Sequence, residues 1–243
     1  MKLLSRMAPA SFAALLAIFI CGFGVDSPKR PSLPLIVTAA PVYQPLAALR
    51  GGDRFPTGAR LMLVRDGVAT PLIEGFASTA DANVSFDGKK LLFAGKESVN
   101  DKWSVWEFTL EDRSVRKVIS GESDVIRPLY LPGDGIVFAR RTTRGFQLEA
   151  AKLDGSGALP LTYMAASALP ETVLADGRIL FQAGFPLGTD LDHGAVPELF
   201  LVFSDGSGVE SYRCDHGTPR WGGTQLASGD IVFTHGSHLA RFT

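Results

Sequence analysis

Short polar turns alternate with apolar runs along most of the chain, and they fall into two series that rise in step. The first series is Asp87-Gly88, Asp134-Gly135, Asp176-Gly177 and the reversed Gly229-Asp230, each followed by a short apolar run that ends in Phe. The second series is Asp66-Gly67, Glu111-Asp112, Asp154-Gly155 and Asp205-Gly206. Asp-Gly between apolar runs favours a two-residue β-hairpin, because both central positions need positive φ. The two series therefore predict a repeat that contains two hairpins.

Two hairpins in a repeat of about 40 to 50 residues are typical of a β-propeller blade with four antiparallel strands. A β-sandwich also alternates short strands with turns, but it gives no reason for the same two turns to recur in phase. Three full repeats follow a strand pair over 60–74, and two strands with the start of a third follow them over 220–242. We predict an all-β propeller over 60–243, with about four to five blades in an incomplete ring. An open ring indicates a fragmentary chain, or edges that a partner covers.

The turn sequences resemble those of a known family. The run FDGKKLLFAG from Phe86 is similar to an element of the PD40 repeats of TolB-like, WD40-like propellers. The runs LEAAKLDGSG from Leu148 and LFLVFSDGSG from Leu199 are similar to the second hairpin of those repeats. The resemblance covers 60–243. It implies an exported, non-catalytic scaffold that binds a protein or peptide of the cell envelope.

Charge and motifs narrow the classes of function. With 24 Lys and Arg against 25 Asp and Glu, the chain carries a net charge of −1, so nucleic acid is not expected as a partner. Prolyl-oligopeptidase-like peptidases place such a propeller before a hydrolase domain, but this sequence has no G-x-S-x-G motif. We therefore expect no enzyme activity and no catalytic residue. The alternatives are a domain of a larger redox, haem or peptidase enzyme, and a propeller that binds a small molecule or glycan in its central channel.

The first 24 residues have the pattern of a signal peptide or membrane anchor. Lys2 and Arg6 precede an uncharged apolar stretch over 7–23. Lipidation at Cys21 is an alternative to cleavage, and each version predicts a periplasmic or extracellular domain that meets the membrane only through this segment. Residues 25–59 are rich in proline and predict a linker or a strap on the domain, with regular structure beginning near Arg60.

Blade connectivity separates the connections between strands into two faces. The Asp-Gly hairpins lie on one, the hairpin face, where each Asp side chain is expected to cap its own turn. The connections between second and third strands, and between successive blades, lie on the other, the loop face. Imidazole, guanidinium and indole groups gather there, and they are our candidate binding residues: His193, His216, His235, His238, Arg140, Arg141, Arg144 and Trp221.

Four of the residues near the loop face are metal-ligating types, namely Cys214, His216, His235 and His238. Imidazoles and a thiolate bind zinc or copper when three or four converge. The spacings C-x-H and H-x-x-H match no strong metal signature, so exposed loop histidines and a buried cysteine are the alternative. Asp190 and Asp192 resemble part of a calcium loop that lacks its remaining ligands. No other cofactor is predicted.

Overall fold

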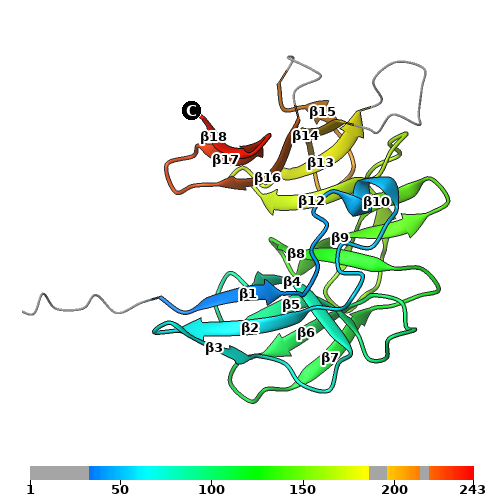
Figure 1. Ribbon diagram of the computed structural model, residues 1–243. Coiled ribbons are helices and arrows are strands. Elements are labelled where there is room, and N and C mark those ends of the chain that lie inside the picture. Colours follow the sequence, from blue (N-terminus) through cyan, green and yellow to red (C-terminus); the bar gives the residue numbers. More distant parts are fainter. Residues whose placement is uncertain (1–32, 186–195, 214–218) are drawn as a thin grey trace, which may run out of the picture. The chain divides into compact units, whose positions relative to one another are not determined.

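A computed structural model describes residues 33–185, 196–213 and 219–243 (Figure 1). It forms five antiparallel sheets, three with four strands and two with three. The first two sheets contain, in chain order, β1 (Leu35–Ala39), β2 (Arg60–Arg65), β3 (Val68–Pro71), then β4 (Ser78–Val84), β5 (Lys90–Lys96), β6 (Ser104–Thr109) and β7 (Val115–Ile119). The third contains β8 (Val125–Leu131), β9 (Gly135–Thr142), β10 (Gly145–Lys152) and β11 (Leu159–Pro160). The last two contain β12 (Ala168–Val173), β13 (Ile179–Phe185), β14 (Val196–Val202), β15 (Glu210–Ser211), then β16 (Arg220–Gln225), β17 (Ile231–His235) and β18 (His238–Phe242).

Each strand pairs with the next one along the chain, so every sheet is a meander, and each sheet packs on its neighbours in sequence. Phenylalanine and aliphatic side chains fill the space between sheets, with Phe93, Phe138 and Phe181 fully buried on the second strands of three successive sheets. This is the β-propeller arrangement, and the sequence-based prediction of an all-β propeller with about four to five blades is confirmed, with five sheets among the described residues.

The hairpin turns form where predicted, but the expected positive φ at both central positions is wrong for four of them. Only the glycine has positive φ in the turns at Asp87, Asp154, Asp176 and Asp205. The Asp side chain of five turns accepts a hydrogen bond from the backbone N–H two residues later, at 2.9 to 3.0 Å. At Asp154 and Asp205 the serine hydroxyl and this N–H hold the pKa of the carboxyl below its ordinary value. The recurring Asp is therefore accounted for by turn geometry.

Regular structure begins at Leu35, well before Arg60, where the prolines had predicted it to begin. The prolines at 34 and 41 flank β1 rather than interrupt it, and the residues between them are apolar or β-branched, which suits a strand. The rest of the Pro-rich stretch contains the short 3₁₀ helix η1 (Ala47–Arg50). Residues 1–24, with the predicted signal and Cys21, lie outside the described residues. Within the described ranges no helix is long and apolar enough to cross a membrane.

Candidate functional site

The connection from β1 to β2, residues 40–59, forms an insert that packs on the loop face. Ala48, Leu49 and Phe55 are buried in one cluster with side chains of the second, third and fourth blades. The Phe55 ring stacks on Tyr43 with centroids 5.3 Å apart. The insert is therefore part of the hydrophobic core rather than a loose linker.

A chain of buried charges follows the insert across the innermost strands. Arg54 of the insert donates to the Asp81 carboxylate on β4, and Asp81 also accepts the backbone N–H of Arg127 on β8, at 3.1 Å. The Arg127 guanidinium donates two hydrogen bonds to Glu171 on β12, at 2.8 and 2.7 Å. Glu171 in turn accepts the backbone N–H of Gly222 on β16. We call Arg54, Asp81, Arg127 and Glu171 the axial ion network.

The network uses equivalent positions in successive blades. The first strands β4, β8, β12 and β16 each shift register once against the second strand, and Asp81, Arg127, Glu171 and Gly222 lie at those shifts. Asp81 and Arg127 have φ of 59° and 54°, and Gly222 has φ of 68°. Such bulges turn the local backbone and side chain away from the regular ladder. Each bulge residue thereby reaches the next blade.

Burial and the neighbouring opposite charges shift the pKa values of these groups in opposite directions. Burial alone would raise the pKa of Asp81, but Arg54 and Arg127 hold the pKa of this carboxyl below its ordinary value. Burial alone would lower the pKa of Arg127, but Glu171 and Asp81 raise it. Burial raises the pKa of Glu171 despite the Arg127 guanidinium beside it. The carboxylates of both pairs are buried, with side-chain exposures of 8% for Asp81 and 3% for Glu171.

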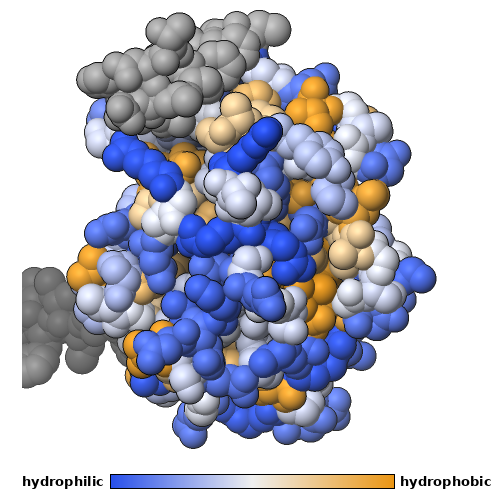
Figure 2. All heavy atoms as spheres, turned by 90° about the vertical axis from the view of Figure 1, so that its right-hand side faces the viewer, coloured by the Kyte–Doolittle hydropathy of each residue, from blue (hydrophilic) through white to orange (hydrophobic). Residues whose placement is uncertain are grey.

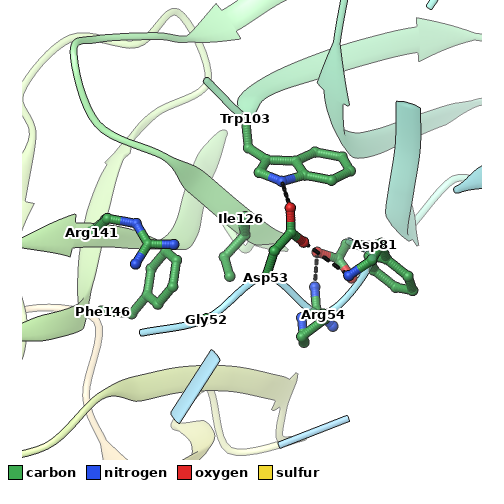
Figure 3. Close-up of a pocket in the computed structure, with 9 residues that line it drawn as sticks. Gly52, Asp53, Arg54, Asp81, Trp103, Ile126, Arg141 and Phe146 are labelled. Atoms are coloured by element: carbon green, nitrogen blue, oxygen red, sulfur yellow. Dashed lines mark hydrogen bonds and ion pairs between the residues drawn. The ribbon is translucent and has the colours of Figure 1, made fainter. Parts of the chain in front are cut away.

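The cavity beside the network is small. It has a volume of about 10 Å³, roughly the room that one water molecule needs, and the insert and the second and third blades form its walls. In Figure 3 the indole N–H of Trp103 points at the Asp53 carboxylate, at 3.3 Å, while Arg141 lies over the ring of Phe146. Among the described residues this part of the structure has no space for a larger ligand.

The three candidate arginines have different surroundings. Arg141 donates to Asp124 at 2.8 Å and to the carbonyl of Gly51, so it fastens the insert to the third blade. Arg140 pairs with Glu149 at 2.7 Å. Arg144 is exposed and has no ion-pair partner within the described ranges. Two of the three candidate arginines are therefore already paired with carboxylates of the chain itself.

Arg144 lines a groove of about 260 Å³ on the loop face of the third blade. Tyr163, exposed at 81%, and Met164 also line it. The buried Gln147 amide holds this loop by donating to the carbonyls of Met164 and Ala166, at 3.2 and 3.1 Å. The groove is therefore an organised surface with an aromatic ring, a thioether and one unpaired cation. Figure 2 shows the loop face as largely hydrophilic, with separate hydrophobic patches.

The remaining candidates are placed as follows. His235 and His238 lie opposite each other where β17 turns into β18, and both are exposed. Trp221 on β16 is half-buried and pairs in register with Thr234. His193, Cys214, His216, Asp190 and Asp192 lie outside the described residues. In the described part of the chain, no group of three His, Cys, Asp or Glu side chains is placed to hold a metal ion.

Comparison with known proteins shows that this chain is similar to several solved structures in its fold. No protein-family model matches the chain, and no curated protein matches it. A search of solved structures finds the Kuenenia stuttgartiensis hydrazine synthase, with a TM-score of 0.70 and 16% identity over 84% of this chain and 36% of that one. It also finds a putative TolB from Agrobacterium tumefaciens, with a TM-score of 0.53 and 19% identity over 63% of this chain and 56% of that one. The fold is that of a TolB-like β-propeller.

A puromycin-hydrolyzing peptidase of Mycobacterium tuberculosis matches with a TM-score of 0.53 and 16% identity, over 76% of this chain and 33% of that one. Propellers similar to this one therefore occur both in TolB and as parts of enzymes. The chain spans between about a third and just over half of the length of these three proteins.

Proposed function

We propose that this chain is an exported, non-catalytic propeller that binds an envelope protein or peptide through its loop face. The observation that carries the proposal is the groove at Arg144 and Tyr163 on the loop face. Beside the insert and the axial ion network the described residues leave a cavity of only about 10 Å³, which is too small for a small-molecule or glycan ligand at that place. The surface open to a partner on this side is the outer loop face, with the groove at Arg144 and Tyr163.

The chemistry of this surface suits a protein partner. Tyrosine, methionine and arginine side chains are enriched at protein interfaces, and tyrosine and arginine are also enriched among the residues that contribute most to binding. The uncharged stretch that follows Lys2 and Arg6, and the TolB-like fold, support export to the periplasm or cell surface.

Site-specific photocrosslinking tests this proposal in cells that produce the protein naturally. A benzoylphenylalanine at position 163 on the loop face is expected to give a discrete crosslinked product in the envelope fraction. The matched control places the same group at position 86, a 74% exposed phenylalanine on the hairpin face. Equal products from both positions, or none from either, would contradict binding through the loop face.

A second candidate is that the chain is the propeller portion of a larger enzyme. The likeness to hydrazine synthase, of which it spans 36%, supports this candidate. The second candidate expects the native protein to carry a catalytic or cofactor-binding domain joined to the propeller, and mass spectrometry of the native polypeptide tests this.

A further inference from the structure

We infer that the groove at Arg144 and Tyr163 binds an internal peptide segment in which an aromatic or large aliphatic residue is adjacent to an aspartate or glutamate. The inference rests on the proposed function and deepens it, because it names the chemistry of the partner segment that the groove selects. It is drawn from the size of the groove, from its one unpaired cation, and from the hydrogen bonds that already occupy its other polar groups.

The size of the groove suits one or two side chains of a larger partner. Its volume is about 260 Å³, below the roughly 300–1,000 Å³ of pockets that enclose a whole small-molecule ligand. Tyr163, Met164 and Pro160 supply its apolar surface, and Tyr163 is 81% exposed. An exposed aromatic ring gains from contact with a second ring or with an aliphatic side chain. The groove therefore takes an apolar anchor from a polypeptide.

The net charge of the groove comes from Arg144. Glu149 is the one carboxylate among the residues that line the groove, and it is paired with Arg140 at 2.7 Å, so its charge is balanced within the chain. The Arg144 guanidinium is exposed and has no ion-pair partner in the described ranges. A guanidinium binds a carboxylate through two parallel hydrogen bonds. Arg144 is thus placed to bind a carboxylate that lies beside the apolar anchor of the partner.

Other polar groups of the groove are already bonded within the chain. The Gln147 carboxamide oxygen accepts the Thr162 hydroxyl, at 3.0 Å, and the backbone N–H of Met164, at 2.8 Å. The Thr142 hydroxyl accepts the backbone N–H of Arg144, at 3.2 Å. Proteins that capture the C-terminal carboxylate of a peptide do so with a set of backbone N–H groups, and these two are occupied. The geometry therefore favours a carboxylate on a side chain of the partner.

A phosphorylated peptide fits this groove less well than an acidic one. Phosphopeptide sites use clusters of arginine, but the neighbouring Arg140 and Arg141 are each paired with a carboxylate of this chain. The one remaining positive charge, that of Arg144, matches the single negative charge of an ionised aspartate or glutamate.

Fluorescence polarisation with the full chain tests the inference. The probe is the labelled hexapeptide Ser-Gly-Phe-Glu-Gly-Ser with both ends capped, and the comparison probe carries glutamine in place of glutamate. Wild type is expected to bind the glutamate probe about tenfold more tightly than the glutamine probe. Arg144→Gln is expected to bind the two probes equally, because it removes the charge that distinguishes them. Tyr163→Ser is expected to weaken the binding of both probes roughly fivefold and to keep the preference for glutamate.

The matched control is Arg65→Gln, which removes an exposed arginine at the hairpin between β2 and β3. It is expected to bind both probes as wild type does. Because Arg144 is exposed and has no ion-pair partner in the part of the chain that the structure describes, an unchanged melting temperature is expected for Arg144→Gln.

Several outcomes would overturn the inference. No binding of the glutamate probe to wild type, or equal binding of the two probes, would contradict a preference for a carboxylate. The wild-type preference in Arg144→Gln would show that the carboxylate does not bind Arg144. Tighter binding of the peptide with phosphoserine in place of glutamate would make the groove a phosphate site, and tighter binding of Ser-Gly-Phe with a free carboxyl end would make it a site for a chain terminus.

The photocrosslinking at position 163 separates this inference from the proposed function. It requires only that a partner lies at the groove, whatever the charge of that partner. A crosslinked product together with equal binding of the two probes would therefore overturn the inference and leave the proposed function standing.

Discussion

Replacing Asp81 by alanine is expected to lower the free energy of unfolding by about 3–5 kcal/mol, because it leaves a buried arginine without its counter-ion. Asp81 accepts hydrogen bonds from the Arg54 guanidinium and from the backbone N–H of Arg127. Its removal therefore unpairs one charge of the insert and one backbone donor of the third blade. Urea denaturation followed by tryptophan fluorescence measures the loss.

The matched control for this substitution is Asp87→Ala in the hairpin turn that follows β4. Asp87 is exposed, and its bonds are local, to Ser85 and to the backbone of Lys89. Its replacement is expected to cost about 1 kcal/mol or less. Equal losses for Asp81→Ala and Asp87→Ala would mean that the axial ion network does not hold the blades together.

Replacing Phe146 by alanine is expected to lower the free energy of unfolding by about 3–5 kcal/mol and to release the insert from the blades. The Phe146 ring is 1% exposed, lies in the cluster that buries Ala48 and Leu49, and supports the Arg141 guanidinium at 4.5 Å. Removing it leaves a cavity beneath the insert and weakens the hold of Arg141 on Gly51. Urea denaturation gives the stability change, and limited proteolysis reports release by cleavage within 40–59.

Phe86→Ala is the control for this second substitution, because Phe86 is 74% exposed. It is expected to change stability by about 0.5 kcal/mol or less. A Phe146→Ala protein with wild-type stability and an uncleaved insert would contradict the assignment of 40–59 to the core.

The blades were predictable from sequence because one local rule repeats. Each turn needs a glycine for positive φ and an Asp whose side chain accepts a backbone N–H, so the same pair recurs, as at Asp87-Gly88 and Asp154-Gly155. The strand β1 was not predictable from proline density, which indicates a linker or a strap over 25–59, because the prolines at 34 and 41 lie only at the ends of this strand. A search for short runs between prolines would have found it.

The axial ion network was not predictable in the same way. Its equivalent positions hold Asp81, Arg127, Glu171 and Gly222, four different residues that share no motif. They become recognisable as a series only when the register of each inner strand is known, because the shift fixes which side chain reaches the next blade. The partners of the candidate arginines were not predictable for a related reason. The sequence separates Arg141 from Asp124 and Gly51, and only the fold brings them together.

Hydrogen exchange on the purified complex is the most direct test of the central claim, that an envelope protein or peptide binds the loop face of this propeller. The measurement compares the chain alone with the chain bound to the partner captured through position 163. The account predicts slower backbone exchange in residues 142–145 and 161–167, and unchanged exchange in the hairpin turns at 85–89 and 132–135. Slower exchange in those hairpin turns, with none at 142–145 and 161–167, would contradict it.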